Sequence, residues 1–501
     1  MADESEGEHM ILKRGILLFF VIFVGAIAYA AKPTSQTPKA IELGEVQLEP
    51  LNLSSQPPPE LADMNMPGMP MNHSQMQMSP SQQPHNMTMP GMTNQQTPAV
   101  QTGPMSQQDL MMAQMIRLGS GTAWQPMDNP MLMKMGHLGS WMIMLHGSSF
   151  ADFDYQGGRR GGYKTVSQNW IMGSGMRPIG RRGVLQLRSM FSAEPFTIGK
   201  NGYPLLFQTG ESLHGKPLVD RQHPHDLFME QSATYYHRLG NQTWLSLYTA
   251  AVGEPALGPV AYPHRYSHFL DPEAPLSHHM MDSTHISFGV ATVGLIHNKW
   301  QLEGSVFNGK EPDDDRYDID YKPWKTSASG RLSYMPNKHW ALQISSGFLN
   351  QPEQLEINNQ ERTTASVSYD KTWKNGWWAS TLAWGHNFES GPDDNGVILE
   401  STLNYKRKNY LFGKVENIQR HGLLQNNPSR SFNITAFSMG IARDLLYIKD
   451  FPLTVGAMIT MFAKPDALDV HYSNFPLAFH VFLHTNTPRM TIQHSSGKIK
   501  M

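Results

Sequence analysis

The chain has 501 residues, enough for two or three ordinary domains or for one large architecture preceded by a tail. Its 40 Lys and Arg balance 42 Asp and Glu, so it lacks the basic excess that nucleic-acid binding requires. It contains no cysteine, which excludes disulfides and thiolate metal sites. Any soft-metal chemistry must therefore use methionine thioethers and histidine imidazoles.

Residues 1–30 have the pattern of a targeting segment. Lys13 and Arg14 precede an apolar run, and Ala28-Tyr29-Ala30 forms a cleavage site of the small-x-small type. The apolar run is shorter than the roughly 20 residues that a bilayer span needs. We therefore expect a signal peptide, with an uncleaved membrane anchor as the alternative.

Residues 31–125 are predicted to form a periplasmic tail rich in Met, His and Pro. Up to about residue 104 it lacks a periodic apolar face, so burial cannot offset its ordering entropy and we expect disorder. The motif MxMPGM occurs at 64–69 and 87–92. Thioethers prefer Cu(I) or Ag(I), whereas imidazole also binds Cu(II) and Zn(II). The predicted tail ligands are Met64, Met66, Met69, Met71, His73, Met76, Met78, His85, Met87, Met89 and Met92.

The alternative for these methionines is an adaptable surface that binds a partner protein. Nineteen of the 33 methionines fall between Met64 and Met144, which favours metal capture.

Ser106 is a suitable N-cap for a short helix near 107–118. The segment 141–146 follows this helix. Within it, Trp141, Ile143 and Leu145 alternate with Met142, Met144 and His146. If the first set faces lipid, the second faces an interior, where its members are either soft-metal ligands or packing residues.

From residue 126 to 501 the sequence predicts a transmembrane antiparallel β-barrel. About 16 segments, with a range of 14–18, alternate with period two, and aromatic residues gather near their ends. Short turns alternate with longer loops, as in bacterial outer-membrane barrels. An even strand number places both termini on the periplasmic side. Residues 163–175 are read as one strand. The segment near 228–237 is also read as a strand, with a short helix as its alternative.

Two long loops, 193–227 and 253–283, carry most of the chemistry. Nine of the 22 histidines fall between His214 and His285. An HxH pattern in an extended segment points both rings to one side, and imidazole beside carboxylate suits Zn(II) or Cu(II), while a methionine pair suits Cu(I). The predicted loop ligands are His223, His225, Asp226, His264, His268, His278, His279, Met280, Met281 and His285.

Other readings of these loops remain open. The rings could form a hydrogen-bonded network without metal, as in many pore constrictions. A hydrolase could use a loop histidine and carboxylate with Ser232 or Ser283, although we expect no enzyme. The acidic segment 311–320 is either a Ca²⁺ loop or, as we favour, a solvated charged loop.

A signal peptide, a tail of Met-Pro-Gly-Met and Asn-His-Ser-Gln-Met units, and a barrel without cysteine resemble the CopB-type copper-resistance outer-membrane proteins. The resemblance covers the tail by composition and the barrel by architecture, and it transfers no individual site. It implies copper binding, resistance or transport. We expect a copper-handling barrel in the bacterial outer membrane, in contact with lipid, metal ions and a periplasmic copper carrier. A general porin is the further alternative.

Overall fold

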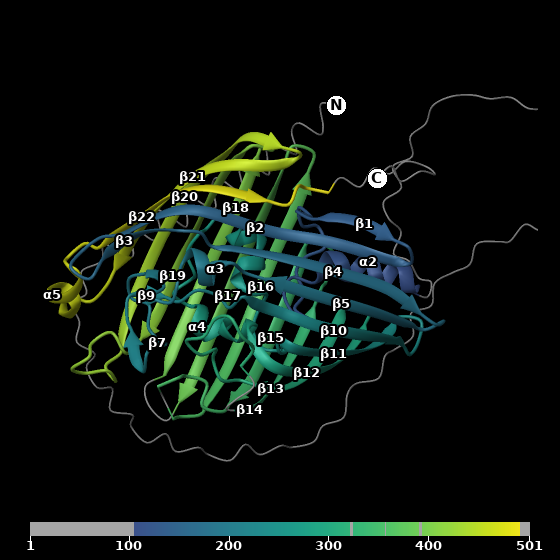
Figure 1. Cartoon of the computed structure of the whole chain (residues 1–501), viewed down its shortest axis with the longest axis horizontal. Coiled ribbons are helices and arrows are strands. Elements are labelled where there is room, and N and C mark those ends of the chain that lie inside the picture. Colours follow the sequence, from purple (N-terminus) through teal and green to yellow (C-terminus); the bar gives the residue numbers. More distant parts are fainter. Residues whose placement is uncertain (1–104, 321–323, 356, 390–392, 491–501) are drawn as a thin grey trace, which may run out of the picture. The chain divides into compact units, whose positions relative to one another are not determined.

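The computed structural model describes residues 105–320, 324–355, 357–389 and 393–490 (Figure 1). The predicted signal peptide and the Met-rich part of the tail lie outside these residues. Among the described helices, none is both long enough and apolar enough to cross a membrane.

Sixteen antiparallel strands close into a barrel. Each strand pairs with its neighbours in chain order, and β22 closes the ring by pairing with β2 from Ser148 to Gln156. The barrel strands are β2 (Trp141–Gln156), β4 (Asn169–Ile179), β5 (Gly183–Phe191), β10 (Phe228–Arg238), β11 (Thr243–Gly253), β12 (Ser287–His297), β13 (Trp300–Asn308), β14 (Thr326–Tyr334), β15 (Trp340–Leu349), β16 (Gln360–Trp373), β17 (Gly376–Glu389), β18 (Asp394–Tyr405), β19 (Asn409–Arg420), β20 (Phe432–Ile448), β21 (Phe451–Ala463) and β22 (Leu477–Asn486).

Two short strands extend this wall beside β2. β1 (Lys134–Leu138) pairs with the start of β2, on the same edge of β2 that pairs with β22 further along the strand. β3 (Gly162–Val166) pairs with the end of β2, on the edge that pairs with β4 nearer the start. The predicted strand number is confirmed, and the segment near 228–237 is a strand. A single predicted strand over 163–175 is wrong, because β3 and β4 pair with different parts of β2 and the chain breaks at 167–168.

The alternation of side chains separates a lipid-facing surface from an interior. In β2, Ile143 and Leu145 are 41% and 39% exposed, whereas Met142 and Met144 are 3% and 8% exposed. The same pattern runs around the barrel, so that the exposed residues are branched and aromatic apolar side chains. The inside is filled with polar and apolar side chains that are almost fully buried, including Arg331 at 1%.

The two ends of the barrel differ in their connections. Short turns such as 180–182, 298–299, 374–375 and 449–450 join strands at one end, called here the short-turn end, where β2 begins and β22 finishes. The longest connections at the other end are 192–227 and 254–286. The second loop is longer than the predicted 253–283, because β12 starts only at Ser287.

Residues 105–133, most of which the sequence groups with the tail, pack inside the barrel. α2 (Gln107–Arg117) lies against β4 and β5, with Ser106 and Asp109 forming a capping box. The following segment crosses the interior: the carbonyl of Thr122 accepts from Gln301 at 3.0 Å, and its hydroxyl accepts from Arg331 at 2.8 Å. These contacts place the segment across the lumen near the short-turn end, and Figure 1 shows α2 beside β4.

The two long loops fold into the same interior. The first contains α3 (Glu194–Thr197) and the short strands β6 (Tyr203–Pro204), β7 (Glu211–Leu213), β8 (Lys216–Leu218) and β9 (Arg221–Gln222). The second contains η1 (Tyr262–His264), η2 (Tyr266–His268), α4 (His278–Met281) and η3 (Ser283–His285). One further turn, η4 (Asp466–Leu468) with α5 (Asp469–Tyr472), lies between β21 and β22.

The second loop also meets the N-terminal segment. The amide of Ala261 donates to the hydroxyl of Ser120 at 2.8 Å. A Cβ at Gly119 would lie 2.5 Å from the side chain of Val260, so any side chain at this position would displace that valine. Together the segment and both loops occupy the lumen that sixteen strands would otherwise leave open to water.

Candidate metal centre

The first loop brings two carboxylates and two histidines together. β7 supplies Glu211, whose carboxylate lies 2.6 Å from Nε2 of His223 and 2.8 Å from Nε2 of His279 in the second loop. α3 supplies Glu194, whose carboxylate lies 2.9 Å from Nδ1 of His225. Both carboxylates are buried, so imidazole nitrogens take the place of bulk water as their hydrogen-bond partners.

The second loop is held to the wall by a buried arginine. The guanidinium of Arg265 donates to Asp282 at 2.6 Å and to Glu400 of β18 at 2.5 Å. Asp282 also accepts from the amide of Tyr262 at 2.8 Å, and it lies 2.6 Å from Nδ1 of His278. The ionic network therefore fixes α4 and its histidines in position.

One group of side chains has the spacing of metal ligands. Ligand atoms of His279, Glu311 and Glu353 all lie within 4.8 Å of one another. Nδ1 of His279 faces Glu311 at 3.5 Å, and its Nε2 faces Glu211. A carboxylate on the second nitrogen is typical of metal-binding histidines, because it orients the ring and increases its basicity. Imidazole with two carboxylates suits Zn(II) or Cu(II).

A second acidic group lies in the segment 311–320. Asp313, Asp318 and Asp320 also have ligand atoms within 4.8 Å of one another, but the first two are exposed. Asp320 accepts the backbone amide of Asp313 at 2.7 Å. These are the contacts of a solvated acidic turn, and we assign no site to it.

Three more imidazoles lie beside His279. The ring centroids of His225 and His285 are 5.3 Å apart, and those of His278 and His285 are 5.2 Å apart. Nδ1 of His285 lies 2.7 Å from the carbonyl of Asp282, and its buried Nε2 has no hydrogen-bond partner. Imidazoles that share a tetrahedral ion at about 2.0–2.1 Å have centroids roughly 5 Å apart. The nitrogens of the three rings do not form a group within 4.8 Å, so ring rotation would be needed to converge on one ion.

Burial keeps several of these rings neutral. It lowers the pKa of His278 to about 4 and holds the pKa values of His264 and His285 well below the usual range. Neutral imidazole is the form that binds metal. His225 differs: burial would lower its pKa, but the carboxylate of Glu194 outweighs burial and raises it.

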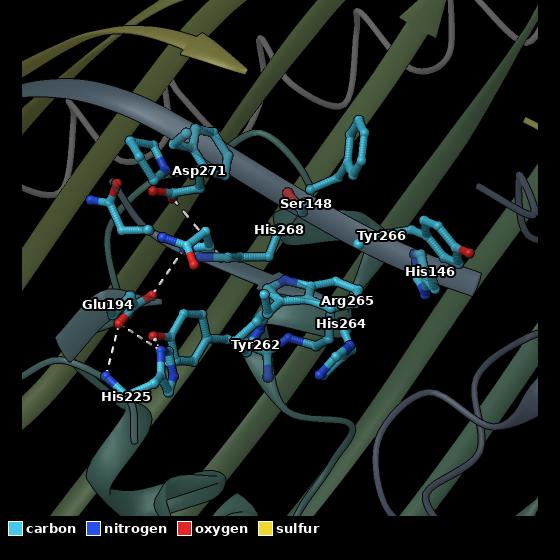
Figure 2. A pocket seen from close by; sticks show the side chains of 18 residues that line it. His146, Ser148, Glu194, His225, Tyr262, His264, Arg265, Tyr266, His268 and Asp271 are labelled. Carbon is cyan, nitrogen blue, oxygen red and sulfur yellow. Dashed lines mark hydrogen bonds and ion pairs between the residues drawn. The ribbon is translucent and has the colours of Figure 1, made fainter. Parts of the chain in front are cut away.

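Three cavities follow one another through the interior. The histidine cavity, of about 20 Å³, has room for one water or ion. It shares His279 with an outer cavity of about 410 Å³, which Glu353 also lines. It shares His225 with an inner cavity of about 50 Å³, lined by His264 and Trp170 as well. Figure 2 shows the inner cavity, with Glu194 and His225 on one side and His146 and His264 on the other.

The structure brings most of the predicted loop ligands together. The histidine cavity is lined by His223, His225, Asp226, His278, His279 and His285. Asp226 is paired with Arg316 at 3.1 Å, which gives it a structural partner. His268 lines the inner cavity, but its ring nitrogens lie 3.1 Å from Glu400 and 3.1 Å from the carbonyl of Glu273.

Other predicted ligands lie elsewhere. Met280 and Met281 belong to an apolar cluster against β17 and β18 and do not line the histidine cavity. The predicted tail ligands, Met64 to Met92 with His73 and His85, lie outside the described residues. Sequence reasoning missed Glu194, Glu211 and Glu353, which are isolated acids without a motif.

The serines proposed for a hydrolase are not placed as nucleophiles. The hydroxyl of Ser232 donates to Glu230 at 2.7 Å, and that of Ser283 accepts from Arg362 at 2.8 Å. Neither hydroxyl has a hydrogen bond to a histidine among the described contacts, which a general base would require.

No family model matches the chain, and no curated protein matches its sequence. Several solved structures are similar to this chain. OmpF of Salmonella typhi, in complex with daunomycin, has 9% identity and a TM-score of 0.45 over 70% of this chain and all of that chain. An anion-selective porin from Comamonas acidovorans has 10% identity and a TM-score of 0.43 over 69% and 99%. A loop-deleted OmpT of Vibrio cholerae has 8% identity and a TM-score of 0.42 over 69% and 99%.

Proposed function

We propose that this barrel binds a transition-metal ion inside its lumen and passes it between the two sides of the bacterial outer membrane, with copper as its physiological ion and Zn(II) as an analogue. The observation that carries the proposal is the group of His279, Glu311 and Glu353, with Glu211 behind the imidazole. This group joins the outer cavity to the histidine cavity, where burial keeps the imidazoles of His278 and His285 neutral. An ion entering from the long-loop end would meet carboxylates first and imidazoles next.

The filled lumen favours this function over that of a general porin. Diffusive porins of 16–18 strands keep an aqueous channel, whereas here residues 105–133 and both long loops occupy the interior. Selective passage then requires exchange between ligand sites that bind an ion strongly enough to admit it and weakly enough to release it.

We expect the reconstituted protein to show far lower ionic conductance in planar bilayers than an open porin of the same strand number. The physical reason is that current needs a continuous water column, and the described interior contains packed side chains instead. Large, stable, ohmic conductance steps from the wild-type protein would support the porin alternative and oppose an occluded lumen.

The tail is proposed to capture Cu(I) on the periplasmic side and to raise its local concentration near the barrel. Deleting residues 61–93 is expected to lower the amount of Cu(I) bound by the purified protein, because it removes the thioethers of both MxMPGM units. Metal analysis after equilibration with Cu(I) and, separately, with Zn(II) tests this.

The barrel site should survive this deletion. Under the proposed function the deleted variant retains one tightly held Zn(II) or Cu(II), because His279, Glu311 and Glu353 are unchanged. Equal Cu(I) binding by the wild type and the deletion would contradict the role of the tail, and loss of all divalent binding on deletion would contradict a separate site in the lumen.

A further inference from the structure

The interior contains a cluster of methionines, called here the methionine chamber, that extends from the short-turn end to the far ends of β5 and β10. Its methionines come from α2, the segment before β1, strands β2, β4, β5 and β10, and the turn after β14. Ten of its 22 buried residues are methionines: Met111, Met115, Met133, Met142, Met144, Met172, Met176, Met190, Met229 and Met335. A second interior cluster of 22 buried residues, around Phe207 and Tyr472, contains only two methionines, Met280 and Met281. The same barrel thus fills one core with aliphatic and aromatic residues and another with thioethers.

The methionines of the chamber are confined to the interior. Within β4, Met172 and Met176 are 2% and 0% exposed, whereas Ile171, which precedes Met172, is 51% exposed. Among the exposed large apolar side chains of the described residues, Met112 on α2 is the only methionine. In β2 and β4 the outward positions therefore carry branched apolar residues, and inward positions carry thioethers.

A buried imidazole without hydrogen bonds adjoins this chamber. His264 is 4% exposed, and neither of its ring nitrogens has a hydrogen-bond partner. Its ring centroid lies 4.3 Å from that of Trp170, a member of the chamber, and His146 packs on Trp170 at 4.7 Å. Figure 2 shows His146 and His264 on the same side of the inner cavity. When both nitrogens of an imidazole are buried and unpaired, the ring has lost its hydrogen bonds to water and has gained no partner in their place. A bound ion would supply that partner.

We propose that the methionine chamber, together with His264 and His146, is a second binding site, selective for soft monovalent ions such as Cu(I) and Ag(I). The inference rests on the proposed metal-handling function and adds the chemical class of the ion on the short-turn side. Thioethers remain neutral at every pH and cannot compensate a divalent charge as carboxylates do, so the chamber discriminates against Zn(II). The inner cavity, which shares His225 with the histidine cavity, is lined by His146, Trp170 and His264 and so reaches the edge of the chamber.

The test uses the full chain in detergent with ¹³C-labelled methionine methyl groups and Ag(I) as a probe that avoids redox chemistry. The resonances of Met142, Met144 and Met172 are assigned from single Met→Leu variants, which preserve volume and packing. We expect Ag(I) to shift these resonances and Zn(II) to leave them unchanged. The triple leucine variant should lose at least about tenfold in Ag(I) affinity at this site, the lower end of what changes around a metal cost.

Matched variants separate binding from packing. Met458→Leu changes a buried methionine of a different cluster and is expected to leave the Ag(I) response of the chamber intact. His264→Phe, which preserves the contact with Trp170, should weaken the Ag(I) response. The proposal would be overturned if the chamber resonances stayed unshifted at Ag(I) levels that saturate the other methionines. An unaltered Ag(I) response in His264→Phe would overturn the role of that ring. Zn(II) binding at His279 is measured in the same samples, so its loss would indicate failure of the proposed function instead.

Discussion

Replacing His279 with alanine is expected to remove tight binding of Zn(II) or Cu(II) by the purified barrel. The change deletes the imidazole that lies between Glu311 and Glu211 and leaves both carboxylates without this ring. We expect affinity to fall by more than about 100-fold, because changes to outer-shell partners alone cost 10–100-fold. Chelator competition with Zn(II) measures the affinity, and thermal unfolding checks that the variant is folded.

Two further variants define this result. Glu211→Gln keeps a hydrogen-bond partner for the ring but removes its charge, and should weaken binding by about 10–100-fold. His214→Ala removes a histidine of the first loop, the loop that carries Glu211. The side chain of His214 is 73% exposed, and its removal should leave the Zn(II) affinity unchanged. If His279→Ala bound Zn(II) as tightly as the wild type, the ion would have to be held elsewhere.

Replacing Arg265 with methionine is expected to cause the largest loss of stability and, with it, the loss of the metal centre. The change leaves Asp282 and Glu400 buried without their cation, and breaking a buried ion pair on one side typically costs 3–5 kcal/mol. Because Asp282 also holds Tyr262 and His278, the second loop should detach from the wall.

Thermal unfolding and limited proteolysis of residues 254–286 measure this effect. Arg181→Met, at an exposed position in a short turn, is the control and should be neutral within about 0.5 kcal/mol. A variant with Glu400→Gln in addition to Arg265→Met should recover part of the stability, since it removes one uncompensated charge. A stable Arg265→Met variant with a protease-resistant loop would contradict the anchoring role of this network.

The barrel itself was predictable because its signals are local. Period two, aromatic strand ends and alternating turn lengths identified all sixteen strands. The break between β3 and β4 was missed because neither glycine nor proline marks Ser167 and Gln168, and the break follows from pairing with two different parts of β2. The inward direction of Met142, Met144 and His146 followed from the same alternation and is confirmed.

The candidate site was predictable only in part. The histidine-rich motifs showed which loops carry the chemistry, but their meeting depends on distant contacts such as Arg265 with Glu400, 135 positions apart. Glu311 was visible only as the first letter of an acidic run, whereas Asp313 and Asp318, which are more conspicuous in that run, are exposed. Glu353 comes from a different loop, and no spacing in the sequence connects it to His279.

The central claim is that the loop histidines hold a transition-metal ion inside the barrel. An anomalous-difference map at the Zn or Cu absorption edge, from crystals of the metal-loaded full chain, tests it most directly. We expect a peak within bonding distance of His279, Glu311 and Glu353, absent in crystals of the His279→Ala variant. Metal-loaded crystals without a peak in the histidine cavity or at its border with the outer cavity would contradict the claim.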